Sequence, residues 1–270
     1  MTTTRYTHGH SDAVLRSHAW RTVENSAAYL VDDLAPGLDV LDVGCGPGTI
    51  TIDFARRVNP GGRAVGIDTS YEVLMKASEL AAVSGVDNVL FEPADVMDLP
   101  FATGSFDIVH AHQVLQHLQD PVGALREMTR VLRPGGVLAV RDADYGAMTW
   151  FPELAGLEEW RDLYARVARA SGGQPDAGRR LLAWVLAAGF DVDDVDVSAS
   201  TWCFADPESR AWWAGTWAER IRGSGVAERA LALGYATREE LEELAEVWRE
   251  WGEQDSALFL VPHTEVRARK

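Results

Sequence analysis

From residue 38 onward, short runs of β-branched and other apolar residues alternate with segments whose apolar residues recur every three or four positions. The short runs predict buried strands, and the recurring spacing predicts amphipathic helices. We expect strands at residues 39–43, 63–68, 89–93, 106–111 and 136–141. We expect helices between them at residues 48–58, 71–84 and 121–132. Because strands that alternate with helices are typical of βαβ units, this half of the chain predicts an α/β fold with a parallel sheet.

The second half of the chain is richer in helical patterns and in tryptophan. Helices are expected at residues 157–170, 177–188, 207–222 and 238–251, and strands at residues 194–204 and 258–269. Nine of the ten tryptophans lie between Trp150 and Trp251. Such rings either fill the contacts between helices or line a pocket for a small apolar molecule. The sequence leaves both interpretations open.

The net charge of the chain indicates which partners are excluded, and its cysteine content indicates the compartment. The chain has 25 Lys and Arg residues against 41 Asp and Glu residues, a net charge of −16. This charge repels polyanions, so we expect no nucleic-acid partner and no membrane partner. The apolar runs are shorter than the ~18–20 residues of a membrane span, and residues 1–20 do not resemble a signal peptide. Two cysteines make no disulfide framework, which favours the reducing cytoplasm.

A glycine-rich turn follows the first expected strand, in the sequence LDVGCGPGT at residues 41–49. Gly44 and Gly46 lack a Cβ atom where the chain turns and where a ligand can approach the backbone. The pattern is G-x-G-x-G, and no Lys-Ser/Thr pair follows it, so a dinucleotide fingerprint and a phosphate loop are both disfavoured. Asp42 opposes a pyrophosphate and favours a cationic ligand, such as S-adenosylmethionine. We expect Cys45 to be structural and not a nucleophile. The residues of this turn that are expected to bind the cofactor are Asp42, Gly44, Cys45, Gly46 and Thr49.

Carboxylates also follow the next two expected strands. Asp68 ends the second strand, 22 positions after Gly46, where it can accept hydrogen bonds from both ribose hydroxyls, with Thr69 beside it. Asp95 follows the third strand, where its carboxylate can reach the adenine amino group and the Val96 N–H can reach a ring nitrogen. Each aspartate alone could be a solvated loop residue or a helix cap. Their joint position after successive strands favours the cofactor interpretation.

Five stretches carry a resemblance to a known family. They are LDVGCGPGT (41–49), VGIDTS (65–70), ADVMDLPF (94–101), SFDIVHAHQVLQHLQDP (105–121) and REMTRVLRPGG (126–136). The chain resembles class I S-adenosylmethionine-dependent methyltransferases of the ubiquinone- and menaquinone-biosynthesis (UbiE-like) group. Its flanks at 8–30, 142–146, 175–181 and 202–213 resemble secondary-metabolite S-methyltransferases of the gliotoxin bis-thiomethyltransferase type.

The resemblance implies a Rossmann-like fold with helices on both faces of a seven-stranded sheet. The implied strand order is 3-2-1-4-5-7-6, with residues 194–204 as strand six and residues 258–269 as an antiparallel strand seven. We expect three parts: an N-terminal helical flap (1–37), a cofactor-binding core (38–206 and 252–270) and a helical cap inserted between the last two strands (207–251). The cofactor is expected to be S-adenosyl-L-methionine.

Polar residues beyond the fourth and fifth strands are candidates for catalysis. His112 is our first choice for the group near the methyl, although it could instead bind the methionine part of the cofactor. Asp144 could deprotonate a substrate or cap the next helix, and Tyr145 follows it. Gln113 and His117 are expected to bind the cofactor, as is one residue of the N-terminal segment, Tyr6. An H-x-H pair at residues 8–10 is too weak to indicate a metal site, so none is expected.

The expected reaction is methyl transfer to a small, apolar or aromatic metabolite. The resemblance to secondary-metabolite S-methyltransferases favours S-methylation of a thiol or dithiol, and a thiol with a pKa near 8.5 needs little help from a base. O- or C-methylation of a quinone, phenol or polyketide is the alternative, and a regulatory or other non-methylating cofactor-binding protein is a further one. We expect the protein to be a monomer or a homodimer. We also expect Cys203 to be buried. The expected acceptor-binding residues are Trp150, Trp212, Trp213 and Trp217.

Overall fold

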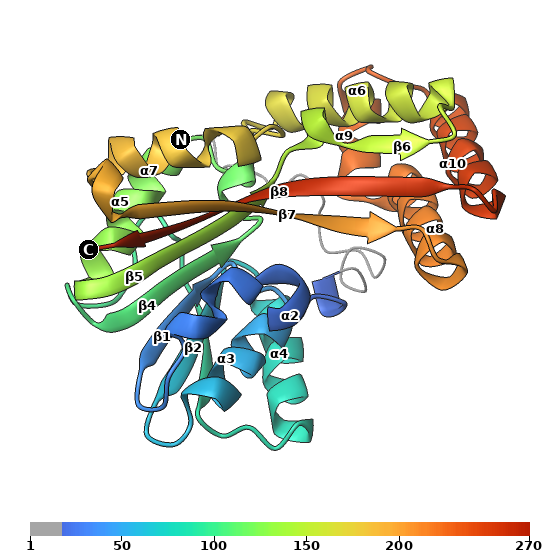
Figure 1. Ribbon diagram of the computed structural model, residues 1–270. Coiled ribbons are helices and arrows are strands. Elements are labelled where there is room, and N and C mark those ends of the chain that lie inside the picture. Colours follow the sequence, from blue (N-terminus) through green and yellow to red (C-terminus); the bar gives the residue numbers. More distant parts are fainter. Residues whose placement is uncertain (1–17) are drawn as a thin grey trace.

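The computed structural model describes residues 18–270, which form a central twisted sheet with helices on both faces (Figure 1). The strands are β1 (Asp39–Val43), β2 (Arg63–Asp68), β3 (Val89–Pro93), β4 (Phe106–His112), β5 (Leu132–Ala143), β6 (Thr149–Phe151), β7 (Val195–Phe204) and β8 (Leu258–Arg269). The α-helices are α2 (Val23–Ser26), α3 (Thr49–Val58), α4 (Tyr71–Val83), α5 (Pro121–Val131), α6 (Ala155–Ala170), α7 (Leu181–Ala188), α8 (Pro207–Gly223), α9 (Gly225–Ala232) and α10 (Arg238–Glu253).

The strand order confirms the expected sheet. β3, β2, β1, β4 and β5 lie side by side and parallel, and β8 pairs antiparallel with β5. β7 pairs antiparallel with the other edge of β8. In chain order this is 3-2-1-4-5-7-6, with one addition that the sequence did not indicate. The short strand β6 pairs with Leu258–Leu260, the first residues of β8.

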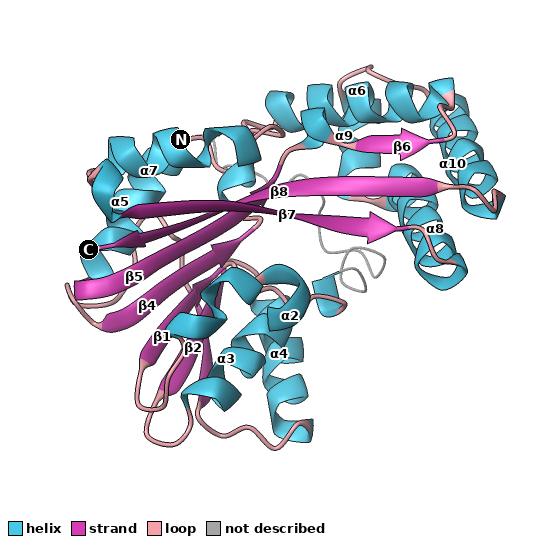
Figure 2. Ribbon diagram, viewed as in Figure 1, coloured by secondary structure: helices cyan, strands magenta, loops and turns pink. Residues whose placement is uncertain are grey.

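Helices cover both faces of the central strands (Figure 2). Alternating apolar residues of these strands pack against the two layers of helices. Val40, Ala64 and Ile108 contact the layer that contains α2 and α3. Their neighbours in the chain contact the layer that contains α5 and α7. Side chains of a strand point alternately to the two faces, so a strand covered on both sides reads as a continuous apolar run. These continuous apolar runs made the central strands predictable from the sequence.

A second core lies beyond the far end of β7 and β8, where α6, α8, α9 and α10 gather (Figure 1). Four tryptophans are fully buried in it, at 0% exposure: Trp160, Trp217, Trp248 and Trp251. Trp160 and Trp217 pack edge to face with ring centroids 4.5 Å apart, and Trp160 and Trp248 do so at 4.8 Å. These rings therefore fill helix contacts. α6 belongs to the same apolar cluster as the three helices after residue 206.

The local structure differs from the sequence expectations in three places. No element was expected between residues 222 and 238, yet α9 forms there, and the Ser224 side chain accepts a hydrogen bond from Val226 N and caps this helix. The helix expected at 177–188 begins with a 3-10 turn at Gly178–Arg180. Cys203 is exposed, because β7 is an edge strand whose alternate residues face outward.

Across residues 18–270, no helix has the length and apolar character needed to cross a membrane.

Candidate active site

The glycine-rich turn joins β1 to α3 with three glycines in the left-handed region. Their φ angles are 66° at Gly44, 55° at Gly46 and 79° at Gly48. A Cβ atom on Gly44 would lie 2.5 Å from a methyl carbon of Val114, so this glycine permits close packing. At Gly46 the nearest atom to such a Cβ is the His18 ring, 3.7 Å away. Gly46 therefore leaves its backbone open toward the adjoining cavity.

Asp68 is held in place by backbone N–H groups. Gly46 N donates to one carboxylate oxygen at 3.2 Å, and Ser70 N donates to the other at 2.9 Å. Each oxygen has a further lone pair, so the carboxylate can still accept hydrogen bonds from a ligand diol. Asp95 is exposed and accepts a hydrogen bond from Met97 N at 2.9 Å, and Val96 after it is buried.

Asp42 is more enclosed than the sequence suggested. It is 3% exposed, and its two carboxylate oxygens accept hydrogen bonds from Thr51 Oγ1 at 2.5 Å and pair with His110 Nδ1 at 2.8 Å. The Asp42 carboxylate therefore lies buried next to the glycine-rich turn, and its charge acts on that turn. Burial, together with the charges of Asp42 and Asp68, raises the pKa of the Cys45 thiol well above its usual value. The thiol is therefore neutral at physiological pH, which fits a structural role.

A cavity of about 550 Å³, here called the large cavity, lies over this turn at the carboxyl ends of β1, β2 and β4. All the expected cofactor-binding residues in the described part of the chain line it: Asp42, Gly44, Cys45, Gly46, Thr49, Asp68, Thr69, Asp95, Val96, His112, Gln113 and His117. Tyr6 lies outside the described residues. The topology thus brings together side chains that are far apart in the sequence.

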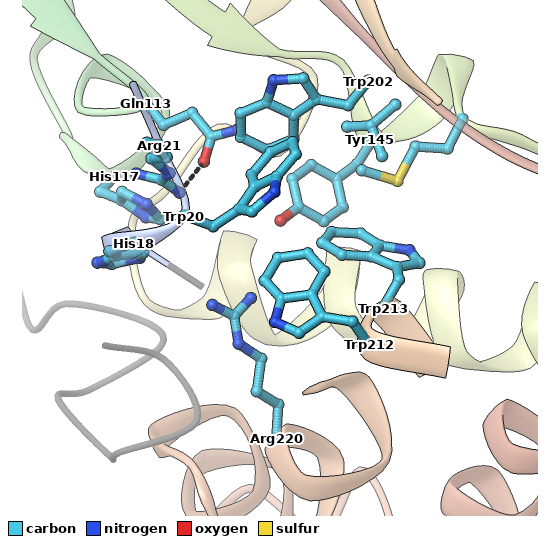
Figure 3. Close-up of a pocket in the computed structure, with 12 residues that line it drawn as sticks. His18, Trp20, Arg21, Gln113, His117, Tyr145, Trp202, Trp212, Trp213 and Arg220 are labelled. Atoms are coloured by element: carbon cyan, nitrogen blue, oxygen red, sulfur yellow. Dashed lines mark hydrogen bonds between the residues drawn. The ribbon is translucent and has the colours of Figure 1, made fainter. Parts of the chain in front are cut away.

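A second, nearly closed cavity of about 20 Å³, here called the small cavity, lies beside the large one (Figure 3). This volume is enough for about one water molecule. It is lined by His18, Trp20, Arg21, Gln113, His117, Tyr145, Met148, Trp202, Trp212, Trp213, Arg220 and Val261. His18, Arg21, Gln113 and His117 line both cavities and so form the wall between them.

Trp20, which precedes α2, closes one side of the small cavity. Its ring centroid lies 5.2 Å from that of Trp202 and 5.3 Å from that of Trp212 (Figure 3). Trp213 lines the same cavity and stacks on Phe204 at 4.3 Å. Two residues expected to bind the acceptor are elsewhere: Trp217 is in the buried aromatic core, and Trp150 stacks on Phe259 at 5.5 Å.

Two histidines that line the large cavity, His112 and His117, are weakly basic. His112 is 4% exposed, and burial together with the charges of Arg21 and Arg141 lowers its pKa well below the usual value. Burial and the charges of Arg21 and Arg220 lower the pKa of His117 to about 3. Both rings are therefore neutral at physiological pH and are poor proton acceptors.

Asp144 and Tyr145 follow β5 but point to different surroundings. The Asp144 carboxylate accepts hydrogen bonds from Arg179 Nε at 2.5 Å and Nη2 at 2.7 Å. Asp144 lines neither cavity, and its side chain does not cap the following 3-10 turn, so its contacts are those of a structural ion pair with Arg179. Tyr145 lines the small cavity and stacks on Tyr164 with ring centroids 4.2 Å apart. Burial raises its pKa, so its phenol is not a base.

Sequence reasoning missed a polar chain behind the wall. Arg21 Nη2 donates to Gln113 Oε1 at 2.6 Å, and the Gln113 amide nitrogen lies 2.8 Å from His263 Nε2. His263 Nδ1 is 2.9 Å from the Val261 carbonyl oxygen, which only accepts. The His263 proton is therefore on Nδ1, and Gln113 donates to Nε2. Among residues 18–270, Gln113 is the one non-glycine residue with positive φ, at 54°. No sequence signal marked this strained position.

Similarity to known proteins shows the family to which the chain belongs. The model of the family described as "Methyltransferase domain" matches residues 34–189. The chain belongs to this family. It is 35% identical over 98% of its length to a protein of Schizosaccharomyces pombe named an uncharacterized methyltransferase, of which 96% is covered. It is 30% identical over 99% of its length to a protein of Aspergillus luteorubrus named probable methyltransferase ltbC, of which 98% is covered.

The solved structures agree in fold. The structure of a Haemonchus contortus phosphoethanolamine N-methyltransferase 2 in complex with S-adenosyl-L-methionine covers 96% of this chain and 57% of its own, with 18% identity and a TM-score of 0.59. The chain is a class I S-adenosylmethionine-dependent methyltransferase, as the sequence motifs indicated. The large cavity suits this cofactor, since it offers a fixed carboxylate at Asp68 and an open backbone at Gly46.

Proposed function

We propose that this methyltransferase transfers the methyl group of S-adenosylmethionine to the sulfur of a small thiol or dithiol with an apolar or aromatic body. The observation that carries the proposal is the lack of a carboxylate base among the described residues that line the small cavity. No aspartate or glutamate of residues 18–270 lines that cavity. His117 in this cavity is a weak base because its pKa is lowered to about 3, and the pKa of His112, which lines the large cavity, is also lowered.

The ionisation of the acceptor then decides which nucleophile can react. A thiol with a pKa near 8.5 is a few per cent thiolate at neutral pH, whereas a phenol with a pKa near 10 is ionised far less. An acidic carbon needs a base still more. Methyl transfer from a sulfonium is otherwise a matter of alignment and exclusion of water. A site with weak bases therefore favours the acceptor that supplies its own anion.

We further propose that the small cavity is the closed form of the acceptor site. The two cavities share Gln113 and His117, so an acceptor whose body is bound in the small cavity would extend its sulfur past these residues into the large cavity, where His112 and the cofactor's methyl group would lie. Trp20, Trp202, Trp212 and Trp213 would contact its apolar body, as aromatic rings in small-molecule sites do. Since the space holds about one water, the acceptor enters when Trp20 withdraws.

In the large cavity we propose the roles expected from the sequence. The cofactor supplies an electrophilic methyl group when it is bound. Asp68 would accept the ribose hydroxyls, and Asp95 and Val96 N–H would contact the adenine. Gly46 would lie against the cofactor, with Thr49 and Thr69 beside it. The division into a flap (1–37), a core (38–206 and 252–270) and a cap (207–251) also remains a proposal, as do the UbiE-like and gliotoxin-type affinities, a cytoplasmic location and a monomeric or homodimeric state.

The test is formation of S-adenosylhomocysteine with dithiothreitol, with thiophenol, with phenol and without acceptor. We expect turnover with the thiols, slower or no turnover with phenol, and none without acceptor. Faster turnover of phenol than of thiophenol at pH 7 would overturn the thiol proposal. Cofactor binding without turnover of any acceptor would indicate a regulatory or other non-methylating protein.

A further inference from the structure

We propose that Arg141 is a positioning residue that fixes the proton of the neutral His112 ring on Nε2. His112 then presents an N–H donor to the large cavity and does not take a proton from the acceptor. The inference rests on the proposed function only in assigning methyl transfer to this cavity. The proton position itself follows from contacts within the chain.

The direction of one hydrogen bond determines the tautomer. Arg141 Nη1 lies 3.4 Å from His112 Nδ1. A guanidinium has donors only, so Nδ1 must be the acceptor and carries no proton. A neutral imidazole then holds its proton on Nε2. This nitrogen is buried and has no hydrogen-bond partner among residues 18–270, while the ring lines the large cavity.

The strand register places the residues that hold Arg141. His112 of β4 lies opposite Arg141 of β5, Arg141 lies opposite Glu265 of β8, and Glu265 lies opposite Ser198 of β7. Residues opposite one another in a sheet share a face, so four adjacent strands carry one row of polar side chains. Arg141 is 0% exposed, and its Nε donates to Glu265 Oε1 at 3.1 Å.

Further contacts keep the guanidinium from rotating. Arg141 Nε and Nη2 lie 3.1 Å and 2.9 Å from Ser200 Oγ, and the guanidinium carbon lies 5.2 Å from the Trp202 ring centroid. Among residues 18–270, the other groups whose charges act on His112 are Arg21, His263 and His110. None of these is a carboxylate that would hold a proton on Nδ1. The ring therefore has one stable protonation state.

The chemistry that follows needs no base. The thiol releases its proton to water before transfer, and its anion receives a hydrogen bond from His112 Nε2–H. The sulfur–methyl bond forms as the sulfonium–methyl bond breaks, which leaves a thioether and neutral S-adenosylhomocysteine. A donor toward the nucleophile favours the anionic form, since hydrogen bonds to charged groups are stronger than neutral ones. This deepens the proposed thiol specificity.

The first experiment reads the tautomer directly. The wild-type protein labelled with ¹⁵N in its histidine rings is measured by long-range ¹H–¹⁵N NMR, and His112→Gln assigns the signals by their loss. We expect a protonated Nε2 and an unprotonated Nδ1 at pH 7. A protonated Nδ1, or an equal mixture of tautomers, overturns the inference. No acceptor is needed, so this result stands even where every thiol fails as a substrate and the proposed function falls.

The second experiment tests the role of Arg141. Arg141→Met leaves Glu265 buried and unpaired and can prevent folding, so the double variant Arg141→Met/Glu265→Met is measured beside it. In the folded double variant we expect a mixture of tautomers, and kcat with thiophenol reduced about ten- to hundredfold, as for a lost hydrogen bond to a charged group. Arg141→Lys, which keeps a donor, should recover part of kcat. Retention of the Nε2 tautomer in the double variant overturns the role of Arg141.

Two matched variants complete the design. The amide nitrogen of Gln can occupy the position of histidine Nε2, whereas that of Asn cannot, so His112→Gln should lose less kcat than His112→Asn. Equal losses would contradict a donor at Nε2. Ser198→Ala is the control, because Ser198 contacts Glu265 and not Arg141 or His112. It should leave the tautomer of His112 unchanged.

Discussion

The carboxylate of Asp68 accepts a hydrogen bond from the backbone N–H of Gly46 at 3.2 Å, across 22 residues of sequence. This contact joins the carboxyl end of β2 to the turn after β1. It holds the carboxylate at the rim of the large cavity, with the second oxygen fixed by Ser70 N. The spacing that the sequence indicated is therefore a direct contact in the fold.

Replacing Asp68 tests its proposed role. Asp68→Ala should weaken S-adenosylmethionine binding by roughly 1.5–3 kcal/mol, since ribose hydroxyls lose a charged acceptor. Asp68→Asn keeps an acceptor oxygen and should lose less. Isothermal titration calorimetry measures both, with far-UV circular dichroism to verify the fold. Unchanged affinity in Asp68→Ala would refute the assignment, and binding of NADH by the wild type would challenge the identity of the cofactor.

The two sides of α8 should respond differently to truncation. Trp217→Ala should lower the free energy of unfolding by roughly 3–5 kcal/mol, because it empties a fully buried site. Trp212→Ala should raise the acceptor KM and leave cofactor affinity within about twofold, because Trp212 lines the small cavity. Urea unfolding and steady-state kinetics separate the two. Similar effects of both variants would argue against the small cavity as the acceptor site.

The ion pair at Asp144 should contribute to structure and not to catalysis. Asp144→Asn keeps oxygen and shape but removes the charge that Arg179 contacts. Because the Arg179 side chain is more than half exposed, we expect a stability loss of about 1 kcal/mol or less. The value of kcat/KM should stay within about threefold from pH 7 to pH 9. A loss beyond about a hundredfold would return Asp144 to the catalytic candidates.

Asp142 should make stability depend on pH. Burial raises its pKa to about 8, against about 3.9 in an unfolded chain. Between these values the folded protein keeps a proton that the unfolded chain releases, so this group lowers stability as pH rises from about 4 to about 8. Asp142→Asn removes the titration and keeps the oxygen that accepts from Gln116 N at 3.2 Å.

The measurement for Asp142 is the free energy of unfolding in urea at pH 5, 6.5 and 8. The value for the variant minus that for the wild type should increase with pH, by at most about 1.4 kcal/mol per pH unit. A difference that is constant over this range would mean that Asp142 does not titrate with a raised pKa in the folded state.

The sequence predicted the centre of the sheet well because β1, β2 and β4 are buried on both faces. β1, β2 and β3 were expected with the bounds that the structure has, since their apolar runs end at glycine, proline or aspartate. The cofactor turn was also predictable, because glycines at fixed spacing are a local requirement of the backbone. These features depend on short stretches of chain.

The acceptor side was harder to predict because it depends on long-range packing. Helical spacing placed Trp213 and Trp217 on one face of α8, yet Trp213 reaches the small cavity while Trp217 is enclosed by Trp160 and Trp248. The role of Trp20 depends on its contact with Trp202, which is far from it in the sequence. The row from His112 to Ser198 appears only when four strands are in register, which no local pattern specifies.

One acceptor with two nucleophiles tests the central claim most directly. 4-Mercaptophenol carries a thiol and a phenol on the same ring, so binding of the body is common to both outcomes. The protein is incubated with it and with S-adenosylmethionine carrying a trideuterated methyl group, and the product is identified by mass spectrometry and NMR. We predict 4-(methylthio)phenol with the label on sulfur, formed faster than without enzyme. Label on oxygen, giving 4-methoxythiophenol, would contradict the account.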